Sequence, residues 1–166
     1  METKSQVKYG QELGPNLIKI AKKLIDNKNL CRLLVNTDLD PLNKETHGDI
    51  NTLSLLHKNI KVIPLITADE QTTQSKIVIL YSNGEVGANL STEALSFIIT
   101  IYVPFKEWLI TGDTLRPFAI MSEIRQSLQD RRINGLGEIK YDSFNLATLT
   151  EEMGCYTMRF NIYAFA

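Results

Sequence analysis

The 166-residue sequence is poor in the residue types that carry most recognisable chemistry. It contains two cysteines, two histidines and one tryptophan, and its 18 basic and 19 acidic residues nearly cancel to a net charge of −1. The cysteines, Cys31 and Cys155, are far apart and belong to no Cys–His cluster, which excludes a disulfide-stapled mini-protein. We expect both to be buried packing residues in a reducing compartment. The missing basic excess argues against a dedicated nucleic-acid-binding protein.

Long hydrophobic runs are also missing. The longest, over residues 97–105, is interrupted by Thr100 and Pro104, and it is far shorter than the roughly 20 residues that a membrane-spanning helix needs. The polar residues 1–6 lack the apolar segment of a secretory signal. We therefore expect no membrane association, and a protein that is kept in the cytoplasm or built into something assembled there.

No pattern of catalytic or ligand-binding residues stands out. His47 and His57 have no nearby cysteine, so we expect loop or packing histidines. Asp38 and Asp40 hint at a calcium loop, but the required glycine and closing glutamate are missing, and a turn is the better interpretation. The Gly-Leu-Gly at 135–137 lacks the third glycine of a dinucleotide loop. We expect no enzyme activity, no catalytic residue, no metal site and no cofactor.

What the sequence does contain is ordinary globular composition, 43% hydrophobic and 22% charged, which at this length predicts a single domain over residues 1–166. Residues 1–13 are mostly polar and are expected to form a flexible arm. Pro15 then opens a helix whose apolar residues recur at helical spacing. A second, short helix is predicted over 30–35, and residues 36–59 are expected to form a long loop.

From residue 60 onward the pattern changes to short strands. We expect an edge strand over 60–66, strands over 76–81 and 94–103, and a turn at Asn83-Gly84. The segment 94–103 is apolar on much of both faces, which predicts a central strand or a face covered by a partner.

A helix is predicted over residues 115–133, capped by Asp113 or Thr114, with Phe118 on its buried side. Asn134-Gly135 is expected to stop it, and further strands follow up to the C-terminal end. The predicted fold class is therefore α+β, a mostly antiparallel β-sheet packed against one long helix, with an N-terminal helical segment.

Charge is unevenly distributed along the chain. Residues 1–35 carry a net charge of +4, and residues 36–114 carry −5. Surfaces of opposite sign steer association, so these segments are candidates for a contact between copies; ordinary solvated faces are the alternative. Trp108 is either an interface anchor or a cap on the edge of the core. The candidate interface residues are Lys19, Lys22, Lys23, Phe105, Trp108, Arg131 and Arg132.

The order of elements carries a resemblance to a known family. The chain resembles neck and tail proteins of tailed bacteriophages, in particular the tail terminator (tail-completion) family. The resemblance is carried by Leu115-Arg116-Pro117-Phe118 through Glu123-Ile124-Arg125-Gln126-Ser127-Leu128, then Asn134-Gly135-Leu136-Gly137, a hairpin and a closing alternating strand. The resemblance covers residues 14–166 in the order of elements, although the segment 36–59 departs from it. No individual functional residue is carried over.

The resemblance implies a non-enzymatic virion protein. Members of that family form a closed ring, typically a hexamer, which terminates the tail tube and joins it to the head connector. The implied partners are copies of the chain itself, the tail tube protein, the connector proteins, and DNA that passes through the ring without sequence-specific binding. Alternatives are another neck or tail-connector component, or a cytosolic adaptor domain with a peptide groove near Trp108. A small-molecule enzyme would need a pocket of convergent polar residues, which the sequence does not offer.

Overall fold

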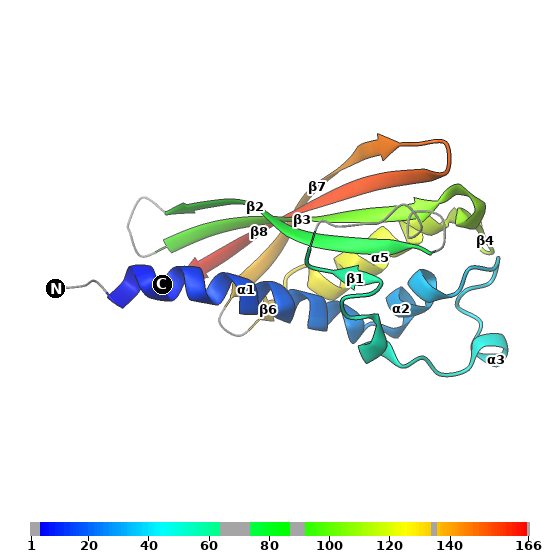
Figure 1. The fold of residues 1–166 in the computed structure, drawn as a ribbon, viewed down its shortest axis with the longest axis horizontal. Helices are drawn as coiled ribbons and strands as arrows, with labels where there is room; N and C mark the ends of the chain where they lie inside the picture. Colours follow the sequence, from blue (N-terminus) through cyan, green and yellow to red (C-terminus); the bar gives the residue numbers. More distant parts are fainter. Residues whose placement is uncertain (1–3, 64–73, 87–91, 134–135, 166) are drawn as a thin grey trace.

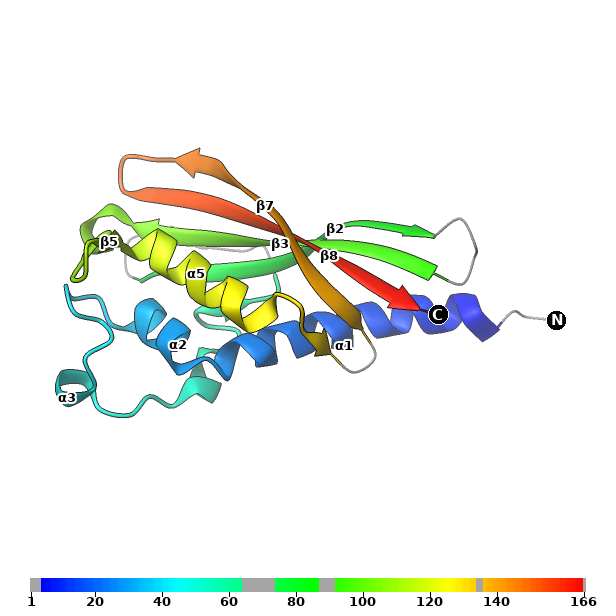
Figure 2. The same ribbon diagram turned by 180° about the vertical axis from the view of Figure 1, so that it is seen from behind.

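A computed structural model describes residues 4–63, 74–86, 92–133 and 136–165. The fold is α+β, as the sequence predicts: helices cover one face of a curled six-stranded sheet (Figures 1 and 2). The main helices are α1 (Lys4–Ile25), α2 (Lys28–Val35) and α5 (Arg116–Leu128). The prediction of one long helix is wrong, because three helices share the cover and α1 is the longest of them.

The sheet has the strand order β1-β2-β3-β8-β7-β6. Its strands are β1 (Ile60–Lys61), β2 (Lys76–Val86), β3 (Thr92–Pro104), β6 (Arg132–Ile133), β7 (Gly137–Leu149) and β8 (Met153–Phe165). The sheet is mixed, because β1 runs parallel to β2, whereas the other neighbouring strands of the described chain are antiparallel. A separate small hairpin joins β4 (Leu109–Ile110) to β5 (Thr114–Leu115).

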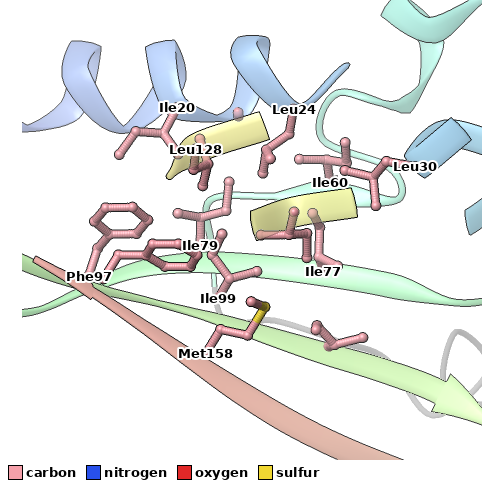
Figure 3. Packing of buried hydrophobic residues seen from close by; sticks show 14 of the residues in the cluster. Ile20, Leu24, Leu30, Ile60, Ile77, Ile79, Phe97, Ile99, Leu128 and Met158 are labelled. Carbon is pink, nitrogen blue, oxygen red and sulfur yellow. The ribbon is translucent and has the colours of Figure 1, made fainter. Parts of the chain in front are cut away.

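The core lies between the helices and the alternating apolar face of the central strands. On β3, Phe97, Ile99 and Ile101 are fully buried, and they are paired across the ladder with β8. Phe97 lies directly opposite Phe160, and their rings stack 5.2 Å apart (Figure 3). The period of two in the sequence therefore identified the buried face correctly, and β3 is a central strand flanked by β2 and β8.

The N-terminal helix begins earlier than predicted. Residues 4–13, expected as part of a flexible arm, belong to α1, and Pro15 lies inside that helix instead of opening it. A proline removes one backbone hydrogen bond and crowds the preceding turn, but it does not prevent the residues before it from being helical. Ile20 and Leu24 of this helix are fully buried against the sheet and α5.

Helix α5 is shorter than predicted at its C-terminal end. It ends at Leu128, and Asp130 then adopts a positive φ of 58° that turns the chain into β6. The expected stop at Asn134-Gly135 lies outside the described residues. The expected caps are also wrong, because Asp113 and Thr114 are held in the β4–β5 hairpin and the cap position falls on Leu115, which makes no side-chain capping bond.

One connection differs from the expectation, and a second contains short helical turns. Asn83-Gly84 lies within β2, next to a register irregularity between Tyr81 and Asn83, so the predicted turn is a bulged strand. The segment 36–59 contains a helical turn, α3 (Lys44–His47), and a 3₁₀ turn, η1 (Thr52–Leu55). The part of the 60–66 prediction beyond residue 63 lies outside the described residues.

Candidate interaction surfaces

Five of the seven candidate interface residues come together at the junction of α1 with the end of α5 and β6. Lys19, Lys22, Lys23 and Arg132 line an open hollow with Asp26 and Ile133. Lys23 and Arg131 line the neighbouring hollow, which also contains Asp26 and Asn27. All five cationic side chains are exposed. We call the set Lys19, Lys22, Lys23, Arg131 and Arg132 the basic surface.

The packing of α1 and α5 explains why these cations gather. The apolar stripe of α1 points into the core, so the lysines between its members point outward. At the end of α1, the Asn27 side chain donates hydrogen bonds to Glu123 Oε2 and Ser127 Oγ of α5, each at 2.9 Å. This contact holds the α1–α2 junction beside α5, whose C-terminal end leads into Arg131 and Arg132.

The other two candidates, Phe105 and Trp108, lie at the far end of the sheet. Trp108 follows the short 3₁₀ helix η2 (Phe105–Glu107), and its Nε1 donates a 2.9 Å hydrogen bond to the carbonyl of Val103. Its ring lies so close to Gly154 that a Cβ there would come within 2.5 Å of Trp108 Cζ2. This is the geometry of a cap on the edge of the core, and the interface role of Trp108 remains a prediction. Phe105 is exposed beside it.

An exposed apolar surface continues from this end along the β7–β8 hairpin. Phe144, Leu146 and Leu149 of β7 are 50%, 53% and 58% exposed. The half-buried Tyr156 of β8 lies in contact with Phe144 and with Phe118 of α5. We call Phe118, Phe144, Leu146, Leu149 and Tyr156 the hairpin surface.

Sequence reasoning missed the hairpin surface. It placed Phe118 on the buried side of the helix, but Phe118 is 40% exposed because the hairpin twists away from α5 (Figure 2). The alternation of Phe144 and Leu146 was the available signal. It reports which residues share a face of the strand, but not whether anything covers that face.

The turn that joins β7 to β8 is acidic. Glu151 and Glu152 are exposed, and with Phe105 and Lys106 they line a shallow hollow. The hydroxyl of Thr150 accepts hydrogen bonds from the backbone N–H groups of Glu152 and Met153, at 3.3 Å and 3.0 Å. The N–H of Phe105 donates to the carbonyl of Glu152 at 2.8 Å, so the turn is tied to η2. We call Glu151 and Glu152 the acidic turn.

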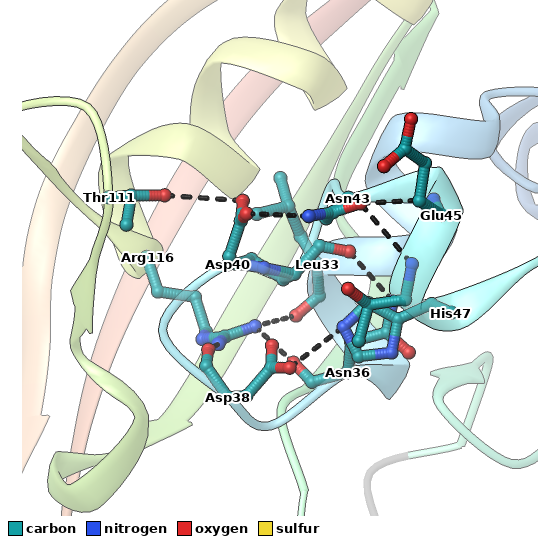
Figure 4. Close-up of polar contacts among 11 residues, drawn as sticks. Leu33, Asn36, Asp38, Asp40, Asn43, Glu45, His47, Thr111 and Arg116 are labelled. Carbon is teal, nitrogen blue, oxygen red and sulfur yellow. Dashed lines mark hydrogen bonds and ion pairs between the residues drawn. The ribbon is translucent and has the colours of Figure 1, made fainter.

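Arg116 is a fully buried arginine that links several elements at one end of the helical layer. Sequence reasoning did not identify it as important. Arg116 opens α5 at 0% exposure. Its guanidinium donates to the carbonyls of Leu33 and Asn36 at 2.6 Å and to that of Asp38 at 2.7 Å (Figure 4). It also donates to the carbonyl of Glu107 at 2.7 Å. These bonds tie α2, the start of segment 36–59 and η2 to α5. Burial lowers the pKa of Arg116.

Glu107 lies in the same buried region. Its side chain is 2% exposed and accepts a 2.9 Å hydrogen bond from Ser75 Oγ, while its Oε1 has no hydrogen-bond partner in the described chain. Burial raises the pKa of this carboxyl group, and the hydrogen bond from Ser75 and the charge of Arg116 only partly oppose that effect. Nearby, His47 Nε2 lies 2.8 Å from Asp38 Oδ2.

The residue types with reactive side chains are separated from one another. Cys31 and Cys155 are buried, and burial raises the pKa of each thiol to about 11. His57 is exposed. Across the ranges that the structure describes, no group of three or more His, Cys, Asp or Glu residues is arranged to hold a metal ion. Nor does any helix in those ranges have the length and apolar character needed to cross a membrane.

Comparison with known proteins adds one match. No curated protein matches the chain. The model of the YomW family matches residues 27–162, which include α2, α5 and nearly the whole sheet, together with the hairpin surface, the acidic turn and the cations Arg131 and Arg132. The match covers most of the chain, and the chain therefore belongs to the YomW family, a phage-derived family.

Proposed function

We propose that the chain is a non-enzymatic structural protein of a phage particle, which forms a ring at the head–tail junction, terminates the tail tube and joins it to the connector. Membership of a phage-derived family supports the phage origin. The proposed position in the particle is supported by the order of helices and strands along the chain, which resembles that of tail terminator proteins. The proposed location is the virion, with assembly in the host cytoplasm.

The hairpin surface is the observation that carries the proposal. Three large apolar side chains of β7, Phe144, Leu146 and Leu149, are at least half exposed. Only Gly137 and Glu138 of that strand pair with β6, so its outer edge from residue 142 to 149 has no strand partner in the described part of the chain. Exposed apolar strand edges attract other chains, and assembly into a particle would cover this one.

The proposed partners follow from the position. They are copies of the chain in a ring, a hexamer by the resemblance, together with the tail tube protein and the connector proteins. DNA would pass through the ring without sequence-specific contacts. Exposed carboxylates of the segment 36–59, among them Asp40, Glu45 and Asp49, suit a wall that repels the phosphate backbone.

Deleting the gene from the phage tests the proposal. We expect tails of uncontrolled length and heads without tails, because nothing would stop growth of the tube or join it to the head. A plasmid copy should restore normal particles, and an antibody against the chain should label the head–tail junction in electron micrographs.

Other outcomes would contradict this position. Label elsewhere on the neck or tail would indicate another connector component. Normal particles that lack the chain by mass spectrometry would indicate a cytosolic adaptor.

A further inference from the structure

The acidic turn and the basic surface are two charged regions that the fold keeps apart. The acidic turn lies at the end of the sheet that is tied to η2, whereas the basic surface lies where the last turns of α1 meet β6 (Figures 1 and 2). In the described ranges, no ion pair engages Glu151, Glu152, Lys22, Lys23, Arg131 or Arg132. Their charges are therefore available to another molecule.

Apolar groups accompany both regions. Leu146 and Leu149 are exposed immediately before the acidic turn, on a hairpin that extends past the helical cover (Figure 2). The half-buried Ile133 lines the basic hollow between Lys19, Lys22 and Arg132, and the long lysine and arginine stems add further apolar area. Each region thus carries mainly one sign of charge together with apolar surface, although Asp26 lies among the cations and Lys106 lies beside the acidic turn. This is the composition of a protein–protein contact.

We propose that the β7–β8 hairpin of one copy docks on the basic surface of a second copy, with Glu151 and Glu152 facing Lys22, Lys23, Arg131 and Arg132. Charge-assisted bonds between carboxylates and these cations supply orientation, and the apolar neighbours supply buried area. Because two different surfaces meet, the contact repeats head to tail, and it closes into a ring when the rotation per subunit permits. The ring rests on the proposed function; the pairing of these two surfaces is the new inference.

A second copy accounts for more of the surface than a nucleic acid does. DNA would engage the basic surface alone, and it would leave the acidic turn and the exposed leucines without a partner. One contact between copies neutralises both charged regions and covers Leu146 and Leu149. The uneven charge along the sequence predicts that the basic N-terminal region pairs with the acidic segment 36–114. The proposed contact uses a different acidic partner, because the acidic turn lies outside that segment.

Charge reversal tests the pairing directly. The first variant carries Glu151→Lys with Glu152→Lys, and the second carries Lys22→Glu with Lys23→Glu. We expect each alone to weaken self-association by about tenfold or more in sedimentation equilibrium, because the first change turns the attraction between the two surfaces into repulsion and the second cancels the charges of Arg131 and Arg132. A one-to-one mixture should restore association, because the unaltered turn of the second variant then meets the unaltered basic surface of the first. Added salt should weaken association of the wild-type protein.

The matched control reverses two exposed carboxylates of the segment 36–59, through Glu45→Lys with Asp49→Lys. This variant has the same change in net charge, and we expect association within about twofold of wild type. Circular dichroism and thermal unfolding establish that every variant is folded. If the control weakens association and the turn variant does not, the acidic segment is the partner of the basic surface and the inference is overturned.

Three further outcomes would overturn the inference. One is a wild-type protein that is monomeric at its highest soluble concentration; another is a mixture of the two variants that fails to restore association. The third is a Lys22/Lys23 variant that loses DNA binding in a gel-shift assay while it self-associates normally, which would identify a nucleic-acid surface. The proposed function is tested by a separate observation, namely whether the chain is found at the head–tail junction of particles.

Discussion

The two halves of strand β7 carry similar apolar residues, which are buried in one half and exposed in the other. In the half nearest β6, Ile139 is fully buried, and Tyr141 packs edge-on against Phe160, with ring centroids 5.5 Å apart. In the half beyond the irregularity at Tyr141–Ser143, Phe144 and Leu146 are half exposed. The sequence pattern is the same in both halves, and the helical cover makes the difference.

The comparison separates residues that maintain the fold from residues that are free to contact other chains. Under α1 and α5, apolar side chains are buried, and Arg116 satisfies four carbonyls. Past the end of that cover, the hairpin leaves apolar and acidic side chains in solvent. Substitutions in the covered half should therefore change the free energy of unfolding, and substitutions in the uncovered half should change association.

The largest effect is expected at Phe160 of β8, which lies opposite Tyr141 in the covered half of β7. Phe160→Ala removes a ring that stacks on Phe97 and contacts Tyr141, and it should lower the free energy of unfolding by about 3–5 kcal/mol. Urea unfolding followed by circular dichroism measures the loss. A loss below about 1 kcal/mol would show that this half is not the core that the fold depends on.

Arg116→Met should have the next largest effect. The change leaves the carbonyls of Leu33, Asn36, Asp38 and Glu107 without their donor, and we expect a loss of about 2–4 kcal/mol. Arg125→Met on the same helix is the control. Arg125 is exposed over the ring of Tyr141, so its loss should cost below about 1 kcal/mol. Equal losses for the two variants would contradict the role of Arg116.

Glu107→Gln should change the pH dependence of stability. Because burial raises the pKa of Glu107, the folded chain holds this proton more tightly than the unfolded chain does. Its contribution thus favours folding below the ordinary carboxyl pKa and is lost as pH rises through the raised pKa. The variant should lose less stability than wild type as pH rises from about 4 to 7.

The exposed Glu152 provides the comparison for Glu107. Glu152→Gln removes one carboxyl group from the uncovered half, where no burial of charge opposes folding. Urea unfolding at a series of pH values should therefore give a pH slope for Glu107→Gln that differs from those of wild type and of Glu152→Gln. Identical slopes for both variants would show that Glu107 carries no burial cost.

Much of the covered half was predictable from sequence. The alternation of Leu95, Phe97, Ile99, Ile101 and Val103 identified the buried face of β3, and all five are buried. The α+β class is also confirmed. These features depend on periodicity within single elements, which a sequence displays directly.

The features that involve several elements were not predictable in this way. Arg116 looks like a surface residue, because the carbonyls that satisfy it come from α2, the segment after it and η2. The basic surface was predicted in two pieces, at 19–23 and at 131–132, and only the packing of α1 beside the end of α5 unites them. Phe118 was misplaced for the same reason, because its exposure depends on how far a distant hairpin twists away from α5.

The smallest effect on folding is expected in the uncovered half, at Phe144. Phe144→Thr keeps a residue type that favours strands and removes an aromatic ring that is already half exposed. We expect the free energy of unfolding to fall by less than about 1 kcal/mol, well below the loss for Phe160→Ala. Self-association, measured by light scattering, should weaken, because the hairpin surface loses one of its exposed aromatic side chains.

The two phenylalanine variants together decide whether the division of β7 is real. Both remove an aromatic side chain that packs against the same pair of strands, and they differ in whether helices cover it. If Phe144→Thr destabilises the fold as much as Phe160→Ala does, the hairpin is part of the core and its apolar residues need no partner. If it leaves both folding and association unchanged, the exposed ring serves neither purpose, and the apolar part of the contact between copies is limited to Leu146, Leu149 and their partners.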